Sequence, residues 1–196
     1  MRNQYSFTEI MSTCWSLLLT KIAYPKARLI RRPIYMRGRG SLDGGKFLTT
    51  GHGCRFDLIG DKKTLFIGNN CEMGDMTHIV AHEKVEIGDN VLIASKCFIS
   101  DTNHGVYKGQ NQDSPITEPN KRKLATIPVK IGNNVWIGEN VVILAGTQIG
   151  DGCIIGANAV VSGFIEEKTI AVGIPARVVK KWSDKANRWE VVGDEN

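Results

Sequence analysis

The chain has 196 residues, of which 42% are hydrophobic and 23% are charged, and its formal net charge is +5. This composition excludes an intrinsically disordered chain and is typical of one domain with a sizeable core. The longest strongly apolar run, 15–19, is far shorter than the roughly 20 residues that cross a membrane, and we expect no cleavable signal peptide.

Residues 1–45 are expected to form a basic N-terminal cap. The first 42 residues hold eight Lys or Arg against one Glu, which gives this segment a charge of +7. Aromatic residues are too sparse among these charges for a nucleic-acid platform, so the segment indicates either contact with an anionic membrane surface or a solvated face. Apolar residues at roughly helical spacing predict a helix or an irregular cap over the first coils. They are Ile10, Met11, Trp15, Leu18, Leu19 and Ile22.

The five cysteines are an odd number, are scattered, and include no CxxC pair. This usage favours reduced thiols in a cytoplasmic protein.

Beyond the cap, aliphatic residues recur every six residues in three registers, and most are followed by a small residue. A period of six matches neither a helix nor a simple amphipathic strand, and it indicates short flat sides that meet at repeated corners. Three such sides make a triangular coil of 18 residues, and stacked coils bury their aliphatic side chains on one another. The residues on this period are Ile67, Met73, Ile79, Ile87, Ile93, Ile99, Ile131, Ile137, Ile143, Ile149, Ile155 and Val161.

The repeats, most clearly IGNNVWIGENVVILAGTQIGDGCIIGANAVV, resemble the left-handed parallel β-helix of the hexapeptide-repeat acyltransferase family. The resemblance covers about 60–181 and implies an all-β catalytic domain at 46–181 with a C-terminal tail at 182–196. It also implies a cytoplasmic homotrimer that uses acetyl-CoA as acyl donor, requires no metal, and holds its coenzyme channels between subunits.

The repeat is interrupted between Ile99 and Ile131, which predicts an extruded loop at about 101–128. The loop begins with SDTNHG, which is similar to the DxNH element of sugar O-acetyltransferases that modify lipopolysaccharide O-antigens and capsules. The resemblance implies that His104 is the general base that takes a proton from a sugar hydroxyl. Asp101 or Asn103 would then orient the imidazole, although both are also ordinary turn residues.

A second set of residues is expected along coenzyme A. Trp136, in IGNNVWIG, is too large for a narrow coil, so an outward indole would line the pantetheine channel or pack at the trimer seam. Arg177 and Lys180 would approach the phosphates, unless they are plain surface charges. By matching motif positions, the coenzyme set is Trp136, Glu139, Ala157, Ser162, Gly163, Arg177 and Lys180.

On the acceptor side, galactoside and maltose acetyltransferases place an Asn where this chain has Met76, with Asp75 and His78 beside it. We therefore expect Asp75, Met76 and His78 to contact the acceptor, a sugar or lipid-linked glycan. The function indicated is acetyl transfer to a sugar hydroxyl of an O-antigen or capsular glycan.

Two alternatives remain at this point. A metal lyase like the γ-class carbonic anhydrases would need three histidines on one metal, with His78 and His82 as a pair and His52 or His104 as the third. A solenoid without chemistry would need none of these residues.

Overall fold

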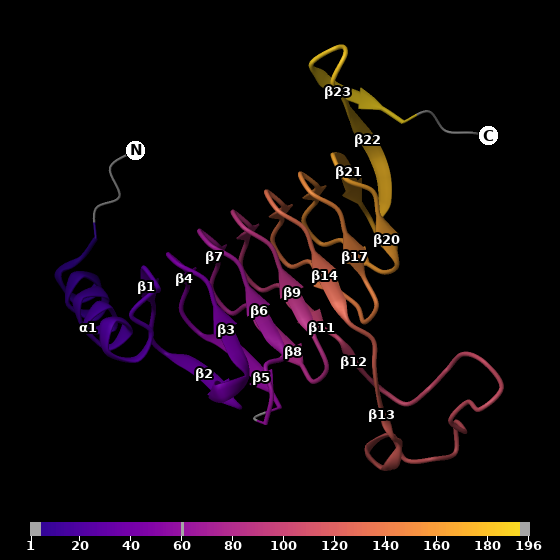
Figure 1. The fold of residues 1–196 in the computed structure, drawn as a ribbon, viewed down its shortest axis with the longest axis horizontal. Coiled ribbons are helices and arrows are strands. Elements are labelled where there is room, and N and C mark those ends of the chain that lie inside the picture. Colours follow the sequence, from indigo (N-terminus) through magenta and orange to yellow (C-terminus); the bar gives the residue numbers. More distant parts are fainter. Residues whose placement is uncertain (1–4, 60, 193–196) are drawn as a thin grey trace.

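The computed structural model describes residues 5–59 and 61–192, so the outermost parts of the predicted cap (1–4) and tail (193–196) lie outside the described residues. The chain winds into a parallel β-solenoid in which each complete coil contributes one short strand to each of three sheets (Figure 1). The predicted solenoid architecture is therefore confirmed. The helix and the C-terminal strands lie at opposite ends of the stack.

We name the sheets A, B and C in the order in which the chain meets them. Sheet A contains β1 (Leu29–Ile30), β4 (Thr49–Thr50), β7 (Glu72–Met73), β10 (Leu92–Ile93), β15 (Trp136–Ile137), β18 (Ile154–Ile155) and β21 (Thr169–Val172). Sheet B contains β2 (Ile34–Arg37), β5 (Cys54–Leu58), β8 (His78–Ala81), β11 (Phe98–Ser100), β16 (Val142–Ile143) and β19 (Val160–Val161). Sheet C contains β3 (Leu42–Gly44), β6 (Leu65–Ile67), β9 (Val85–Ile87), β14 (Val129–Ile131), β17 (Gln148–Ile149) and β20 (Phe164–Ile165).

All twelve aliphatic residues on the six-residue period are buried, with exposed fractions of 0–4%. They stack in columns because partners in adjacent strands lie in register, as Ile93 and Ile137 do in sheet A and Ile99 and Ile143 do in sheet B. The period therefore marked the core correctly.

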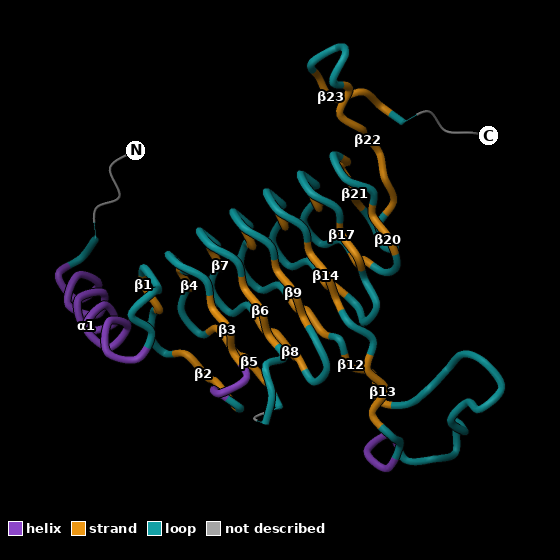
Figure 2. The backbone as a smooth tube through the Cα atoms, viewed as in Figure 1, coloured by secondary structure: helices purple, strands orange, loops and turns teal. Residues whose placement is uncertain are grey.

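The coils are not all 18 residues long. Trp136 pairs with Ile154, 18 residues later, whereas Glu72 pairs with Leu92, 20 residues later. The extra residues leave the solenoid at the edge between sheets B and C, as the eight-residue step from Ile79 to Ile87 shows. The long insertion emerges at this same edge. We call it the B–C edge, and the other two the A–B and C–A edges; Figure 2 shows the loops along them.

Side-chain amides and carboxylates tie successive coils together along the C–A edge. The amide N–H of Asn69 donates to Asp89 (2.6 Å), that of Asp89 to Asn133 (2.8 Å), and that of Asn133 to Asp151 (2.7 Å). Glycine precedes each step because a Cβ atom there, for example at Gly68, would collide with the next coil. The Gly-Asn and Gly-Asp pairs of the repeat are thus edge residues.

Strands of the solenoid begin before the predicted boundary at residue 46, because β1, β2 and β3 already form a coil. The boundary at 181 also falls inside a strand, β22 (Arg177–Ser183), which pairs antiparallel with β21 and with β23 (Arg188–Val191). Residues 182–192 therefore extend sheet A as a hairpin. Neither end carries the hexapeptide signature, so the sequence pattern did not predict the strands before residue 46 and after residue 181.

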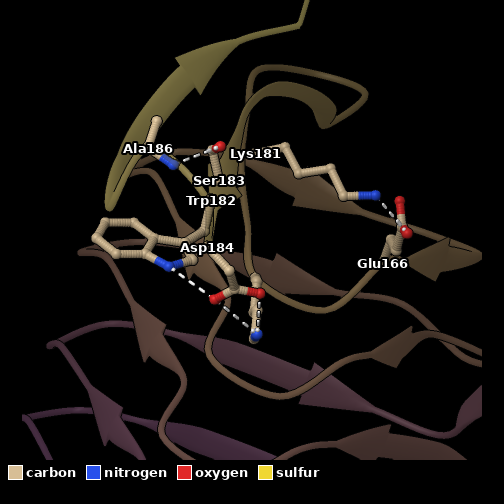
Figure 3. Close-up of polar contacts among 7 residues, drawn as sticks. Glu166, Lys181, Trp182, Ser183, Asp184 and Ala186 are labelled. Atoms are coloured by element: carbon tan, nitrogen blue, oxygen red, sulfur yellow. Dashed lines mark hydrogen bonds and ion pairs between the residues drawn. The ribbon is translucent and has the colours of Figure 1, made fainter.

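Polar contacts fasten this hairpin to the last coil (Figure 3). Lys181 pairs with Glu166 (2.7 Å), and Lys168 pairs with Asp184 (2.8 Å), which also accepts a hydrogen bond from the indole of Trp182 (3.1 Å). The Asp184 carboxylate raises the pKa of Lys168. Because these ion pairs are exposed, they fix the direction of the hairpin more than they add to stability.

The predicted N-terminal helix is α1 (Phe7–Ala23), but it presents its polar face to the solenoid. Ser16 and Thr20 are fully buried, and their hydroxyls accept hydrogen bonds from the N–H groups of Arg32 (3.2 Å) and Ile30 (2.9 Å). The cap is thus a helix, but the apolar residues that predicted it do not form its packing face, and of the six only Leu19 is half-buried. The first coil exposes backbone donors that need acceptors, and hydroxyl side chains supply them. Ile10, Met11, Trp15, Leu18 and Ile22 are exposed.

We expect Thr20→Val to lower the free energy of unfolding by about 1–3 kcal/mol, because the buried N–H of Ile30 loses its acceptor. Ile22→Ala, a change on the exposed face, should cost no more than about 0.5 kcal/mol. Urea denaturation of both variants measures the difference. The reverse order of costs would mean that the apolar face packs inward after all.

Candidate functional site

The insertion leaves the B–C edge as a two-stranded antiparallel ribbon that extends away from the solenoid (Figure 1). Its strands are β12 (Thr102–His104) and β13 (Leu124–Thr126), in which His104 lies opposite Leu124. His104 is exposed at the end of β12. The general base implied by the resemblance therefore stands where the ribbon opens into its loop, available to a bound molecule.

Asp101 anchors the base of the ribbon. Its carboxylate is fully buried and accepts hydrogen bonds from the N–H groups of three consecutive residues of the preceding coil, His82 (3.0 Å), Glu83 (2.7 Å) and Lys84 (2.8 Å). The hydroxyl of Thr102 donates to it as well (2.7 Å). The carboxylate thus fixes the corner from which the ribbon departs.

These contacts do not support the expected role of Asp101 as the residue that orients the imidazole. Asn103 is no better placed, because adjacent residues of a strand project to opposite faces and Asn103 directly precedes His104 in β12. A lone motif such as DTNH cannot distinguish an acid that orients a histidine from one that caps a turn.

Two residues that the sequence analysis did not identify order the loop next to His104. The hydroxyl of Tyr107 donates to the backbone carbonyl of His104, and Arg122 holds this Tyr in turn. The guanidinium of Arg122 lies 2.8 Å from the Tyr107 oxygen and 5.9 Å from the ring centroid, and its Nε donates to the carbonyl of Thr117 (2.9 Å). In the sequence, Arg122 is hidden within a KRK run that indicates only charge.

His78 lies on the outer face of sheet B, within a polar cluster. Its Nε2 is 3.0 Å from Oδ2 of Asp57, and its ring is 5.2 Å from that of Phe98. Burial alone would raise the pKa of Asp57, but hydrogen bonds from Arg55 and His78, with the charges of Arg55 and Arg37, lower it below its usual value. A hollow beside the cluster is lined by Tyr35, Arg37, Arg55 and Asp57. The cluster can therefore present charged hydrogen-bonding groups to a polar ligand.

The neighbouring Asp75 and Met76 lie at the A–B edge. The carboxylate of Asp75 accepts a hydrogen bond from the N–H of His52 (2.6 Å), as the edge residues of other coils do. Met76 occupies a left-handed turn position (φ 57°) with an exposed side chain. Of the three predicted acceptor residues, His78 is thus the one placed on an open sheet face, and Asp75 already serves the edge.

The predicted coenzyme residues are distributed over different sides of the solenoid. Trp136 points outward from sheet A, 51% exposed, between Leu92 and Ile154 of the adjacent strands. Glu139 and Ala157 follow at the A–B edge, whereas Ser162 and Gly163 lie at the B–C edge, two coils beyond the ribbon. Arg177 and Lys180 are exposed on β22. One chain alone does not bring this set together.

The histidines needed for a carbonic-anhydrase-like site do not converge in the described part of the chain. His78 is engaged by Asp57, and Nδ1 of His52 is 2.7 Å from the carbonyl oxygen of Arg32. Across residues 5–59 and 61–192, no group of three potential ligands is close enough to hold a metal ion.

Residues 128–163 match the family model of the bacterial transferase hexapeptide (six repeats). The WbbJ protein of Escherichia coli (strain K12), named for O-acetyl transfer in lipopolysaccharide biosynthesis, is 40% identical over 191 residues, 97% of either chain. The chain belongs to the hexapeptide-repeat acyltransferase family. It is therefore an acyltransferase, as the motifs predicted.

Two solved structures extend this family relationship to the fold. A maltose O-acetyltransferase from Clostridium difficile 630 is 28% identical with a TM-score of 0.57, over 90% of this chain and 89% of that one. A galactoside acetyltransferase solved with coenzyme A is 24% identical with a TM-score of 0.51, over 93% and 76% of the two chains, and shows the fold alone.

We expect Asp101→Ala to lower the free energy of unfolding by about 2–5 kcal/mol, because three partly buried amides lose their shared acceptor. Asp113→Ala, which removes the acceptor for one loop amide, that of Val106, should cost about 1 kcal/mol or less. Urea denaturation separates the two. If Asp101→Ala kept full stability while acetyl transfer fell, Asp101 would be an orienting residue.

Proposed function

We propose that this acyltransferase moves an acetyl group from acetyl-CoA to a sugar hydroxyl of a lipopolysaccharide O-antigen or a capsular glycan, with His104 as general base. The observation that supports this most is the position of His104, exposed at the mouth of an ordered ribbon whose base Asp101 locks to the solenoid. The WbbJ relative, matched along nearly the whole chain, supports the reaction and the class of acceptor.

In the proposed reaction, the neutral imidazole of His104 takes the proton of the acceptor hydroxyl while that oxygen attacks the thioester carbon. The resulting tetrahedral intermediate collapses, the carbon–sulfur bond breaks, and the coenzyme thiolate takes a proton back from the imidazolium. The transfer is direct within a ternary complex, so it requires no serine or cysteine nucleophile. Tyr107 and Arg122 hold the His104 backbone, which reduces the freedom of the base before reaction.

We further propose that each site is shared between two chains of a homotrimer. His104 leaves the B–C edge, which in a three-sided solenoid lies opposite sheet A, where Trp136 points outward. In a trimer, an indole on sheet A would therefore face the ribbon of a neighbouring copy and not its own. Trp136, Glu139 and Ala157 of one chain would line the coenzyme channel that His104 of the next chain faces, with Ser162 and Gly163 on the His104 side.

The acceptor would lie along sheet B of the chain that supplies His104, because His78 is in β8, one coil before the ribbon, and its partner strand β11 leads into it. His78 and the arginines of the adjacent hollow offer hydrogen bonds to glycan hydroxyls or charged groups. A lipid-linked acceptor would place the enzyme at the cytoplasmic surface of a membrane, in contact through its basic N-terminal segment.

We expect His104→Ala to lower kcat for acetyl transfer by about 10²–10⁴-fold with little change in acetyl-CoA affinity, because a general base contributes that much to the rate. His52→Ala, a histidine at the A–B edge, is the matched control and should keep kcat. Thiol release from acetyl-CoA with glycan acceptors measures both. Full activity of His104→Ala would contradict the proposal.

The shared site predicts that two inactive chains complement each other. Co-expression of His104→Ala and Trp136→Ala chains under different tags, with purification on both, yields mixed trimers in which one site of three is intact. Their activity should be about one third of wild type, while each variant alone stays far lower. Mixed trimers no more active than the parent variants would place both residues in one chain's site.

A further inference from the structure

Helix α1 carries a continuous apolar stripe on its outer side, formed by Phe7, Met11, Trp15, Leu18 and Ile22. Their exposed fractions are 77%, 55%, 58%, 53% and 73%. At 100° per residue, these five positions fall within one side of the helix. Isolated exposed apolar side chains are ordinary in a folded protein, but five large ones along one helix face mark a surface that another apolar phase covers.

The stripe cannot turn inward, because the opposite side of α1 is bonded to the solenoid. Thr20 accepts a hydrogen bond from the N–H of Ile30 and donates to the carbonyl of Ser16 (2.6 Å), and Ser16 accepts from the N–H of Arg32. Ser16 and Thr20 are fully buried. Rotation of the helix would break these bonds and leave backbone donors of the first coil without acceptors.

The charged residues near the stripe indicate what kind of surface binds it. The single acid of α1, Glu9, is in the capping box at the start of the helix and bonds to Ser6. Lys26 is exposed near its other end, Lys21 is exposed there too although its ammonium donates to the carbonyl of Ala27 (2.8 Å), and Arg39 lies over the ring of Tyr24 (5.6 Å). An apolar stripe beside exposed cations is complementary to anionic lipid, in which headgroups meet the cations and acyl chains meet the stripe.

The arginines alone are a weaker anchor than the charge count indicates. Arg28 pairs with Glu72 (2.7 Å), and Arg37 lies 3.6 Å from Asp57. Nη1 of Arg31 donates to the carbonyl of Thr50 (3.5 Å). These contacts already engage part of the +7 of residues 1–42 within the chain. The stripe is therefore the stronger candidate for the contact.

We infer that α1 docks on an anionic lipid bilayer by inserting the stripe while the helix lies parallel to the surface. This deepens the membrane contact proposed above and does not depend on acetyl transfer. The described residues include no helix long and apolar enough to pass through a bilayer, so α1 would lie in the interface. Because α1 is at one end of the solenoid, three aligned copies would present three stripes to one plane (Figure 1).

The test is co-sedimentation of the full chain with vesicles of phosphatidylglycerol and phosphatidylcholine. We expect the wild-type chain to bind, and the double variant Leu18→Gln/Ile22→Gln to bind about tenfold more weakly or worse. The matched control Ile116→Gln/Val191→Gln changes two exposed apolar residues away from α1 and should bind like wild type. Trp15 fluorescence should shift to the blue on vesicle addition, with a Trp15→Phe chain as background.

Equal vesicle binding by the wild type and the α1 double variant would overturn the inference, and so would a wild-type chain that does not bind. If the α1 variant instead dissociated the oligomer in analytical ultracentrifugation, the stripe would be an interface between copies. Acetyl transfer to a soluble glycan should be unchanged in this variant. Membrane binding and catalysis can therefore fail independently.

Discussion

Every coil of this protein depends on backbone hydrogen bonds to the coils on either side. The register between the coils therefore limits where the chain can accommodate inserted residues. The N–H of Gly68 donates to the carbonyl of Ile87 (2.8 Å), and the N–H of Gly88 donates to that of Ile131 (2.9 Å). The second bond joins residues on either side of the insertion, yet it is nearly the same length as the first. Any added chain must therefore leave and re-enter at one edge without shifting the strands. The buried carboxylate of Asp101 meets this requirement by fixing the corner where the ribbon departs.

The three-sided cross-section also determines how chemistry is built on the fold. The interior is filled by the aliphatic stack, so functional side chains can project only from outer faces and edges. Groups on one face and on the opposite edge of a single chain point away from each other. A site that needs both an outward indole and an extruded histidine therefore favours assembly from two chains, and this links catalysis to oligomerisation.

The sequence predicted those features that follow from the repeated burial of one aliphatic side chain every six residues. The core positions, the extruded loop and the outward direction of Trp136 follow from the six-residue period and from the lack of space inside a coil. The sequence did not predict features that depend on which hydrogen-bond partner one residue finds in the fold. The apolar residues of α1 looked like a packing face, but the unsatisfied amides of Ile30 and Arg32 select its hydroxyl side. Similarly, no pattern shows that three amides surround Asp101, or that Arg122 folds back onto Tyr107.

The placement of the cysteines has a practical consequence. Cys54, Cys71, Cys97 and Cys153 are buried in the stack, and Cys14 is exposed on α1. Burial raises the pKa of Cys54 to about 11 and also raises the pKa values of Cys71 and Cys97, so these thiols stay protonated and unreactive at neutral pH. A colorimetric sulfhydryl reagent added to the native enzyme would thus encounter chiefly Cys14. We expect a background from this one thiol that is complete before substrate is added, so that the colour that develops during turnover reports liberated coenzyme.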